Sequence, residues 1–356
     1  MKKSLILIAF LALGAMQATA QDDVQKAAAE AAKAIAEAPK EAPAPVKPNY
    51  WKHSLLTNLN FTQTSLTNWA AGGYNTYTLA AYVDGNANYK REKMIWNNRL
   101  QMDYGFLYSE DKPILQKSKD RIYLESKWGY ETPIRHLSYS ASFDFKTQFD
   151  RNWTYKTPAA DGTSEPTKEQ WLAARDLKSA LFSPAYINLG IGLLWTPKKW
   201  LSVNFAPFTG GLVIVDDPLL RYTYGMELRD PDAYADAKAA FSAGDYTAFK
   251  PLRFELGAQL KADAKFVIND NVNYTTQVAL FYNYLEPKRV PRINWDNKLM
   301  WKLMRFFALT FSTNLIYDQT VLVKDSDGDK VMDKTGVQFK EFLEFGFSYT
   351  IGAKKK

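Results

Sequence analysis

Apolar and polar positions alternate with a period of two along most of this chain. From Phe254 to Phe266 the even positions are apolar, and the odd positions are polar or very small. The same alternation runs through Leu137–Lys146 and Phe339–Tyr349. Because successive side chains of a β-strand point to opposite faces, this period predicts strands with one apolar and one polar face. The region from Tyr50 onward is therefore predicted to be all-β.

The alternation predicts about twelve strands, an even number, as bacterial outer-membrane barrels require. Their expected ranges are 52–64, 75–90, 94–107, 119–131, 136–150, 183–196, 200–214, 252–268, 271–286, 291–303, 305–322 and 337–352. Soluble sheets rarely alternate over so many long strands. We therefore predict a transmembrane antiparallel β-barrel over residues 50–352, with long extracellular loops.

The connections between these strands alternate in length. Short connections follow the even-numbered strands, as at 91–93, 197–199 and 269–270. Most connections after odd-numbered strands are long, and these are 108–118, 151–182, 215–251 and 323–336. Outer-membrane barrels place short turns in the periplasm and long loops outside the cell. Both termini are therefore expected in the periplasm.

Tryptophan positions support this orientation. Several tryptophans would lie at the periplasmic ends of strands, namely Trp51, Trp96, Trp128, Trp195, Trp200 and Trp301. An amphipathic indole ring is favoured at the boundary between a membrane and water. These residues predict an aromatic girdle at one edge of the barrel.

The N-terminal region is typical of an exported protein. Residues 1–20 resemble a signal peptide, with Lys2 and Lys3 before an apolar run and a small-residue cleavage site at 18–20. No later run of about twenty apolar residues predicts a transmembrane helix. Because the sequence has 0 cysteines, neither a lipoprotein nor a disulfide-stapled domain is expected.

Two segments outside the barrel have a biased composition. Residues 21–49 combine an alanine-rich helix former with a proline-rich spacer, and we expect a periplasmic helix and linker. Docking of this linker to peptidoglycan or a partner is the alternative. The net charge of +7 includes a basic tail at 353–356, expected to be solvated or to contact anionic lipid. No nucleic-acid-binding motif accompanies it, so no nucleic-acid partner is expected.

The positions predicted to face the lumen carry a nearly balanced set of charges. The positive ones are Arg99, Lys127, Lys146, Lys261, Lys265, Lys298, Lys302 and Lys340. The negative ones are Asp103, Glu125, Asp144, Glu255, Asp263, Asp296 and Glu344. A strongly selective channel would show rings of one sign. Mixed signs favour ion pairs that cross and largely fill the interior, with a wide pore as the alternative.

One predicted external loop has a candidate metal site. Asp325, Asp327, Asp329 and Asp333 surround a glycine in a pattern that resembles the calcium loops of thrombospondin-type and dockerin-like repeats. Lys330 stands where a small residue is usual in those loops. We predict weak Ca²⁺ binding that orders the loop, and the alternative is a solvated acidic hairpin.

The sequence offers little that is typical of an enzyme. His136 and Ser138 resemble the His-x-Ser pair of outer-membrane phospholipases, but the predicted topology places them at a periplasmic turn without a third orienting group. We therefore expect no catalytic residues. Two long loops instead predict short helices, over 167–175 with a Thr-x-x-Gln cap and over 230–241 with a proline in the first turn. These loops are expected to cover the barrel mouth, or alternatively to bind a partner.

The stretch from Ser65 to Asn75 is expected to join the first two strands outside the cell. A Gly-Gly pair permits the positive φ of a tight reversal there. The pattern N-W-x-x-G-G-x-N at Asn68, Trp69, Gly72, Gly73 and Asn75 resembles a Bacteroidota outer-membrane barrel family of unknown function. The segment 337–341 is similar to that family too. The resemblance implies an outer-membrane location and supplies neither a substrate nor catalytic residues.

We rank three functions on these observations. The first is a non-enzymatic barrel that serves as a structural or accessory component of an envelope complex. Its partners would be outer-membrane lipid and envelope proteins, reached through the extracellular loops or the N-terminal linker. The second is a transport channel for small solutes, and the third is an outer-membrane lipid hydrolase.

Overall fold

The computed structural model describes residues 30, 33, 49–65, 74–158, 166–286, 290–326 and 331–352. The chain divides into two units, Met1–Asn49 and Tyr50–Lys356. The predicted signal peptide and the basic tail lie outside the described residues. Of the predicted linker, the structure describes Asn49 and the helical residues Glu30 and Lys33.

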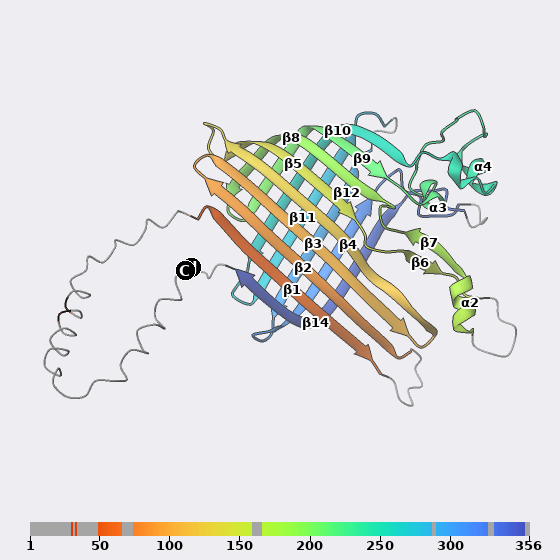
Figure 1. Cartoon of the computed structure of the whole chain (residues 1–356), viewed down its shortest axis with the longest axis horizontal. Helices are drawn as coiled ribbons and strands as arrows, with labels where there is room; N and C mark the ends of the chain where they lie inside the picture. Colours follow the sequence, from red (N-terminus) through yellow and green to blue (C-terminus); the bar gives the residue numbers. More distant parts are fainter. Residues whose placement is uncertain are drawn as a thin grey trace, which may run out of the picture. The chain divides into compact units, whose positions relative to one another are not determined.

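Within the described part of the second unit, twelve strands close into one antiparallel barrel (Figure 1). They are β1 (Trp51–Thr64), β2 (Thr76–Arg91), β3 (Met94–Ser109), β4 (Lys112–Glu131), β5 (Leu137–Thr147), β8 (Ala185–Lys198), β9 (Leu201–Ile214), β10 (Leu252–Val267), β11 (Val272–Asn283), β12 (Arg292–Lys302), β13 (Phe307–Tyr317) and β14 (Val337–Gly352). Each barrel strand pairs with the barrel strands that precede and follow it in the chain. The predicted all-β antiparallel barrel is confirmed.

The barrel closes where the first strand meets the last. β1 and β14 pair antiparallel from Ser54 opposite Gly352 to Asn60 opposite Gly346. Figure 1 shows the start of β1 and the end of β14 at one end of the barrel and the small helices at the other. Closure leaves no unpaired strand edge, which is the condition for a sheet in hydrocarbon.

The predicted loop at 108–118 is wrong. β3 continues to Ser109 and β4 begins at Lys112, so only a tight turn separates them. The ladder shifts register where Gly105 faces Lys119 and Phe106 faces Lys117. This bulge places one extra residue, Ser118, in β4 and breaks the strict alternation there. The sequence pattern therefore hid the first part of β4.

The other elements lie in the long connections. One connection holds β6 (Asn152–Tyr155), α2 (Lys168–Ala173) and β7 (Arg175–Ser179), and the next holds α3 (Pro218–Arg221), α4 (Ala237–Ser242) and the short 3₁₀ turn η1 (Tyr246–Ala248). The predicted cap of α2 is confirmed, because the Thr167 side chain accepts from the Gln170 backbone N–H. The predicted helix over 230–241 begins later than expected. Asp236 accepts from the Ala239 backbone N–H at 2.7 Å, and this cap sets the start of α4.

Large apolar side chains cover the outside of the barrel. Leu189, Phe208 and Leu343 are 61%, 70% and 67% exposed. Such a continuous apolar surface requires a cover, and a lipid bilayer supplies one. The predicted tryptophan girdle is confirmed in position, since exposed Trp96, Trp128, Trp195, Trp200 and Trp301 lie at the end with the short turns. No helix of the described residues is long and apolar enough to span a membrane.

Gly192 in β8 lies very close to the backbone of the neighbouring strand β9. A Cβ at this position would lie 2.0 Å from the Phe205 carbonyl oxygen, whereas a Cβ at Gly210 in β9 would meet nothing closer than 4.0 Å. We expect Gly192→Ala to lower the free energy of unfolding by about 1–3 kcal/mol through this backbone clash. Gly210→Ala is the matched control and should change it by less than about 0.5 kcal/mol. Urea titration of the refolded barrel measures both, and equal midpoints would contradict the clash.

Candidate functional site in the barrel lumen

A buried lysine joins non-adjacent strands across the lumen. The Lys261 ammonium of β10 lies 2.6 Å from Glu125 of β4 and 2.6 Å from Asp144 of β5. It also donates to the Tyr123 hydroxyl at 2.6 Å. β10 and β4 are separated around the barrel by β9, β8 and β5. These contacts therefore cross the lumen rather than follow the wall.

A second lysine makes the reciprocal contact, from β4 to β10. Lys127 of β4 lies 3.0 Å from Glu125 and 2.9 Å from Asp263 of β10. The Gln277 side chain of β11 also donates to Asp263. The cations and carboxylates alternate in space, so each buried charge has an opposite neighbour. Pairing of this kind offsets the cost of removing the charges from water.

Two further contacts cross between other strands. Lys119 of β4 lies 2.7 Å from Glu344 of β14. The Lys298 ammonium of β12 lies 3.7 Å from the centre of the Tyr82 ring of β2. A cation over an aromatic face is attracted by the ring quadrupole. The lumen is therefore crossed by side chains between several pairs of non-adjacent strands.

An arginine-rich cluster occupies the end of the lumen below the long loops. Glu255 of β10 binds Arg253 at 3.2 Å and also forms an ion pair with Arg292 of β12. Arg292 lies 3.5 Å from Asp318, just after β13. Arg253 also donates to the Tyr224 and Gly225 carbonyls at 3.0 and 2.8 Å. This cluster fixes the segment after α3 to the rim of the barrel.

The long loops and the end of β9 share an apolar core at this end of the barrel. The cluster is formed by Ala180, Val213, Val215, Leu220, Tyr222, Met226, Ala240 and Phe249. Tyr186 of β8 and Leu322 pack against it. Arg221 lies in this region and donates to the carbonyls of Val215 and Phe249 at 3.1 and 3.2 Å. Burial lowers the pKa of its guanidinium below the ordinary value. We call these loops the lid.

The two sides of the lumen differ in their access to water. Lys261 and Glu255 are 3% and 2% exposed. Inward side chains of β11, β12 and β13, such as Gln277, Lys298 and Asn314, are half-buried. A water-filled pore would leave the side chains of its wall accessible all round. Side chains therefore fill the lumen tightly between β4 and β10. Along β11–β13 they fill it less tightly.

The predicted ion pairs across the interior are confirmed. The sequence pattern did not include several of the charged residues that take part in them. Lys119 and Arg121 have the same parity as Glu125 and Lys127, so the alternation could have identified them. Asp84 of β2 likewise faces inward and binds Arg99 at 2.6 Å. Arg292 and Asp318 share the parity of the inward-facing Lys298 and Asn314, so the alternation could have identified them as well.

The predicted calcium loop is described only in part. Asp327 and Asp329 lie outside the described residues, while Asp325 and Asp333 are described. The Asp333 carboxylate accepts from the Ser326 backbone N–H at 2.9 Å and lies 3.6 Å from the Lys238 ammonium. In the described ranges, no group of three or more acidic, histidine or cysteine residues could hold a metal ion. Ca²⁺ binding stays a prediction.

The structure also describes only part of the N-W-x-x-G-G-x-N pattern, and it separates the two residues of the His-x-Ser pair. Asn68, Trp69, Gly72 and Gly73 lie outside the described residues. Asn75 is described, and its side-chain amide donates to both carboxylate oxygens of Glu110 at 2.9 Å. His136 is exposed in a turn with a φ of 66°, whereas Ser138 is buried in the lumen.

The closed barrel, its apolar exterior and its charged lumen define a β-barrel of the outer-membrane type. The chain is similar to a family described as a protein of unknown function (DUF3078), which matches residues 61–153. The matched segment runs from β1 to β6 and includes the Asn68–Asn75 stretch. Membership of a Bacteroidota family through that signature stays a prediction. Among curated proteins, none matches this sequence.

Solved structures of similar architecture share little sequence with this chain. The translocator domain of the autotransporter NalP from Neisseria meningitidis is 9% identical, with a TM-score of 0.36, covering 94% of this chain and 99% of that chain. An outer-membrane channel from Pseudomonas putida F1 is 9% identical, with a TM-score of 0.35 and coverages of 87% and 99%. A calcium-bound outer membrane phospholipase dimer from Salmonella typhi is 12% identical, with a TM-score of 0.32 and coverages of 87% and 93%.

Removal of the central cation should destabilise the barrel strongly. Lys261→Met leaves the Glu125 and Asp144 carboxylates without their shared partner in a dry site. We expect the free energy of unfolding to fall by about 3–5 kcal/mol. Lys265→Met is the matched control. Lys265 is exposed on the same face of β10, nearer the end of the barrel with the short turns. Urea unfolding followed by tryptophan fluorescence measures the difference.

A compensated variant separates charge from packing. Lys261→Met combined with Glu125→Gln and Asp144→Asn should recover most of the lost stability, because no uncompensated charge remains buried. Equal midpoints for Lys261→Met and Lys265→Met would show that the contact across the lumen contributes nothing.

Proposed function

We propose that this protein is a non-enzymatic outer-membrane barrel with a closed lumen, acting as a structural or accessory component of an envelope complex. The observation that carries the proposal is the contact of Lys261 with Glu125 and Asp144 across the barrel, made by side chains that are almost fully removed from water. A conducting pore needs a continuous wet path, and these side chains narrow the lumen that such a path would follow.

The surfaces of the barrel support a place in the outer membrane. The apolar outer wall matches the hydrocarbon layer, and the tryptophans at the short-turn end match its boundary with water. With short turns on the periplasmic side, the first residue of β1 and the last residue of β14 would lie at the periplasmic end, and the lid would face outward. The lid, or the linker at 21–49, would then meet other envelope proteins.

A small-solute channel is the second candidate, because one side of the lumen is less tightly filled. The inward side chains of β11–β13 are half-buried rather than fully buried, as Gln277 and Lys298 show. Movement of the lid away from the rim would expose that side. This alternative predicts conductance, so one measurement separates the two functions.

Planar-bilayer recordings test the closed lumen. The refolded wild-type barrel without its first 20 residues should show no steady conductance. The triple variant Tyr123→Ala, Lys127→Ala and Lys261→Ala shortens three side chains that meet across the lumen. It should conduct with a preference for cations, because Glu125, Asp144 and Asp263 remain.

A matched triple variant at the barrel rim controls for charge. Lys198→Ala, Lys199→Ala and Lys265→Ala removes exposed cations and should stay silent. Steady porin-like conductance of the wild type would overturn the closed-lumen proposal and make solute transport the function.

Crosslinking in cells tests the role in a complex. A photo-reactive amino acid at Leu219 in α3, which is 46% exposed on the lid, should yield adducts with envelope proteins. The same group at Leu189 on the outer wall, which is 61% exposed, should yield mainly lipid adducts. Identical adduct patterns at the two positions would show that the lid is not a partner surface.

A further inference from the structure

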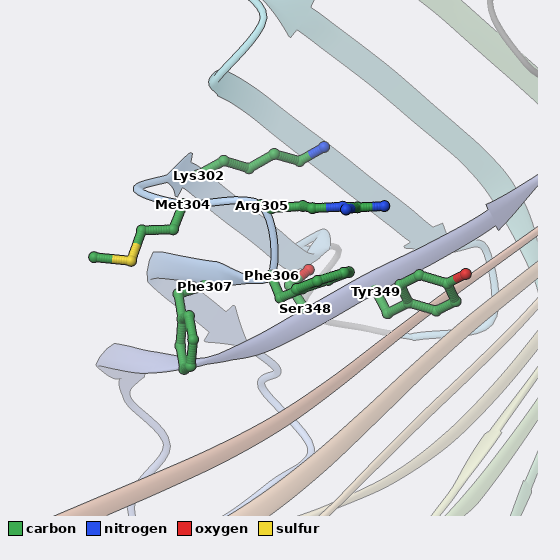
Figure 2. Close-up of a pocket in the computed structure, with 7 residues that line it drawn as sticks. All are labelled: Lys302, Met304, Arg305, Phe306, Phe307, Ser348 and Tyr349. Atoms are coloured by element: carbon green, nitrogen blue, oxygen red, sulfur yellow. The ribbon is translucent and has the colours of Figure 1, made fainter.

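A pocket lies at the end of the barrel opposite the lid, where β12 turns into β13. It has a volume of about 200 Å³ and is lined by Lys302, Met304, Arg305, Phe306, Phe307, Ser348 and Tyr349. Figure 2 shows Lys302 and Arg305 extending in the same direction, while Met304 and Phe307 point away from them. The pocket therefore has a basic side and an apolar side.

The turn that carries the pocket is held firmly against β14. The Ser348 backbone N–H donates to the Phe306 carbonyl at 2.7 Å. The Phe306 ring stacks on Phe347 with 5.6 Å between the ring centres and lies 6.2 Å from the Tyr349 ring. Arg305 lies 4.9 Å from the centre of the Phe306 ring. These contacts thus hold the turn against β14 and place the Arg305 guanidinium beside the Phe306 ring.

The polar groups of the pocket are suited to an anion. The lining has two cations and two hydroxyl groups, and it contains no carboxylate. Among the described residues, neither Lys302 nor Arg305 forms an ion pair, in contrast to the cations that cross the lumen. Lysine, arginine and hydroxyl groups donate hydrogen bonds to phosphate oxygens, and the two cations match its charge.

The surroundings of the pocket indicate that the anion belongs to an amphipathic molecule. Leu303, Met304 and Phe307 beside it are 44%, 69% and 41% exposed. Trp301, also beside it, belongs to the tryptophan girdle and is 50% exposed. Tryptophans of this kind mark the level of lipid headgroups. An acyl chain could lie along the apolar wall while the phosphate occupies the basic side.

We propose that this pocket binds the phosphate group of a glycerophospholipid. This inference rests on the proposed location in a membrane and adds a lipid site to it. Lys302 and Arg305 contact the phosphate, the Ser348 hydroxyl donates to one of its oxygens, and Met304 and Phe307 contact the glycerol and acyl region. The site lies next to the β1–β14 closure, so a bound lipid also covers the last strand.

Native mass spectrometry of the folded barrel in detergent, titrated with phosphatidylglycerol, tests the site. The double variant Lys302→Gln with Arg305→Gln should weaken binding about tenfold or more, because it loses charge-assisted hydrogen bonds. Lys198→Gln with Lys199→Gln removes the same charge from another short turn at the same end and should change binding by less than about twofold. The swap Lys302→Arg with Arg305→Lys should restore binding, and heat-modifiable gel migration confirms that each variant is folded.

Three results would overturn the proposal. Equal losses in the two glutamine pairs would indicate diffuse charge attraction, and no loss in either would leave the pocket without a role. Full displacement of the lipid by millimolar inorganic phosphate would assign the pocket to free phosphate instead. Conductance is measured separately, so a silent barrel with pocket-independent lipid binding would overturn this inference and leave the closed-lumen proposal intact.

Discussion

Hydrogen bonding of the backbone around a closed ring is the constraint on which the rest of this structure depends. An unpaired peptide group costs several kcal/mol in hydrocarbon, so a sheet in a membrane must have no edge. The pairing of β1 with β14 meets this condition. With the ring closed, each strand has one face toward lipid and one toward the lumen. The alternation, the short turns and the outward tryptophans all follow from that geometry.

The lumen presents the opposite problem, because it contains buried charged groups such as Lys261 and Glu125. A buried charge is stable only when an opposite charge and hydrogen bonds surround it. Lys261, Lys127 and their carboxylate partners meet this requirement by reaching across the barrel. The same contacts that stabilise the charges also occupy the part of the lumen between β10 and β4. The stability of the barrel and its closure are therefore expected to depend on the same residues.

The two ends of the barrel have different chemistry, and each fits a different neighbour. The lid end has an apolar core shared by loop residues and the end of β9, and it is tied to the rim by Arg253 and Arg292. The short-turn end carries tryptophans and a small basic pocket at Lys302 and Arg305. A lid with an apolar core offers a shaped surface to proteins. A rim with indoles, and with two cations that form no ion pair within the described part of the chain, is suited to lipid headgroups.

The sequence by itself determined the class of fold, the number of barrel strands in the described part and most of their boundaries, because the period of two is a local property of each strand. It also indicated the balanced lumen, since parity tells which charges face inward. Parity cannot tell which charges meet: that Lys261 contacts Glu125 and Asp144 depends on the curvature and register of the closed barrel. The bulge at Ser118 hid the start of β4 for the same reason, because a register shift is decided by the neighbouring strand. The lid core and the pocket at Lys302 join residues from separate connections and strands, and only the tertiary structure brings them together.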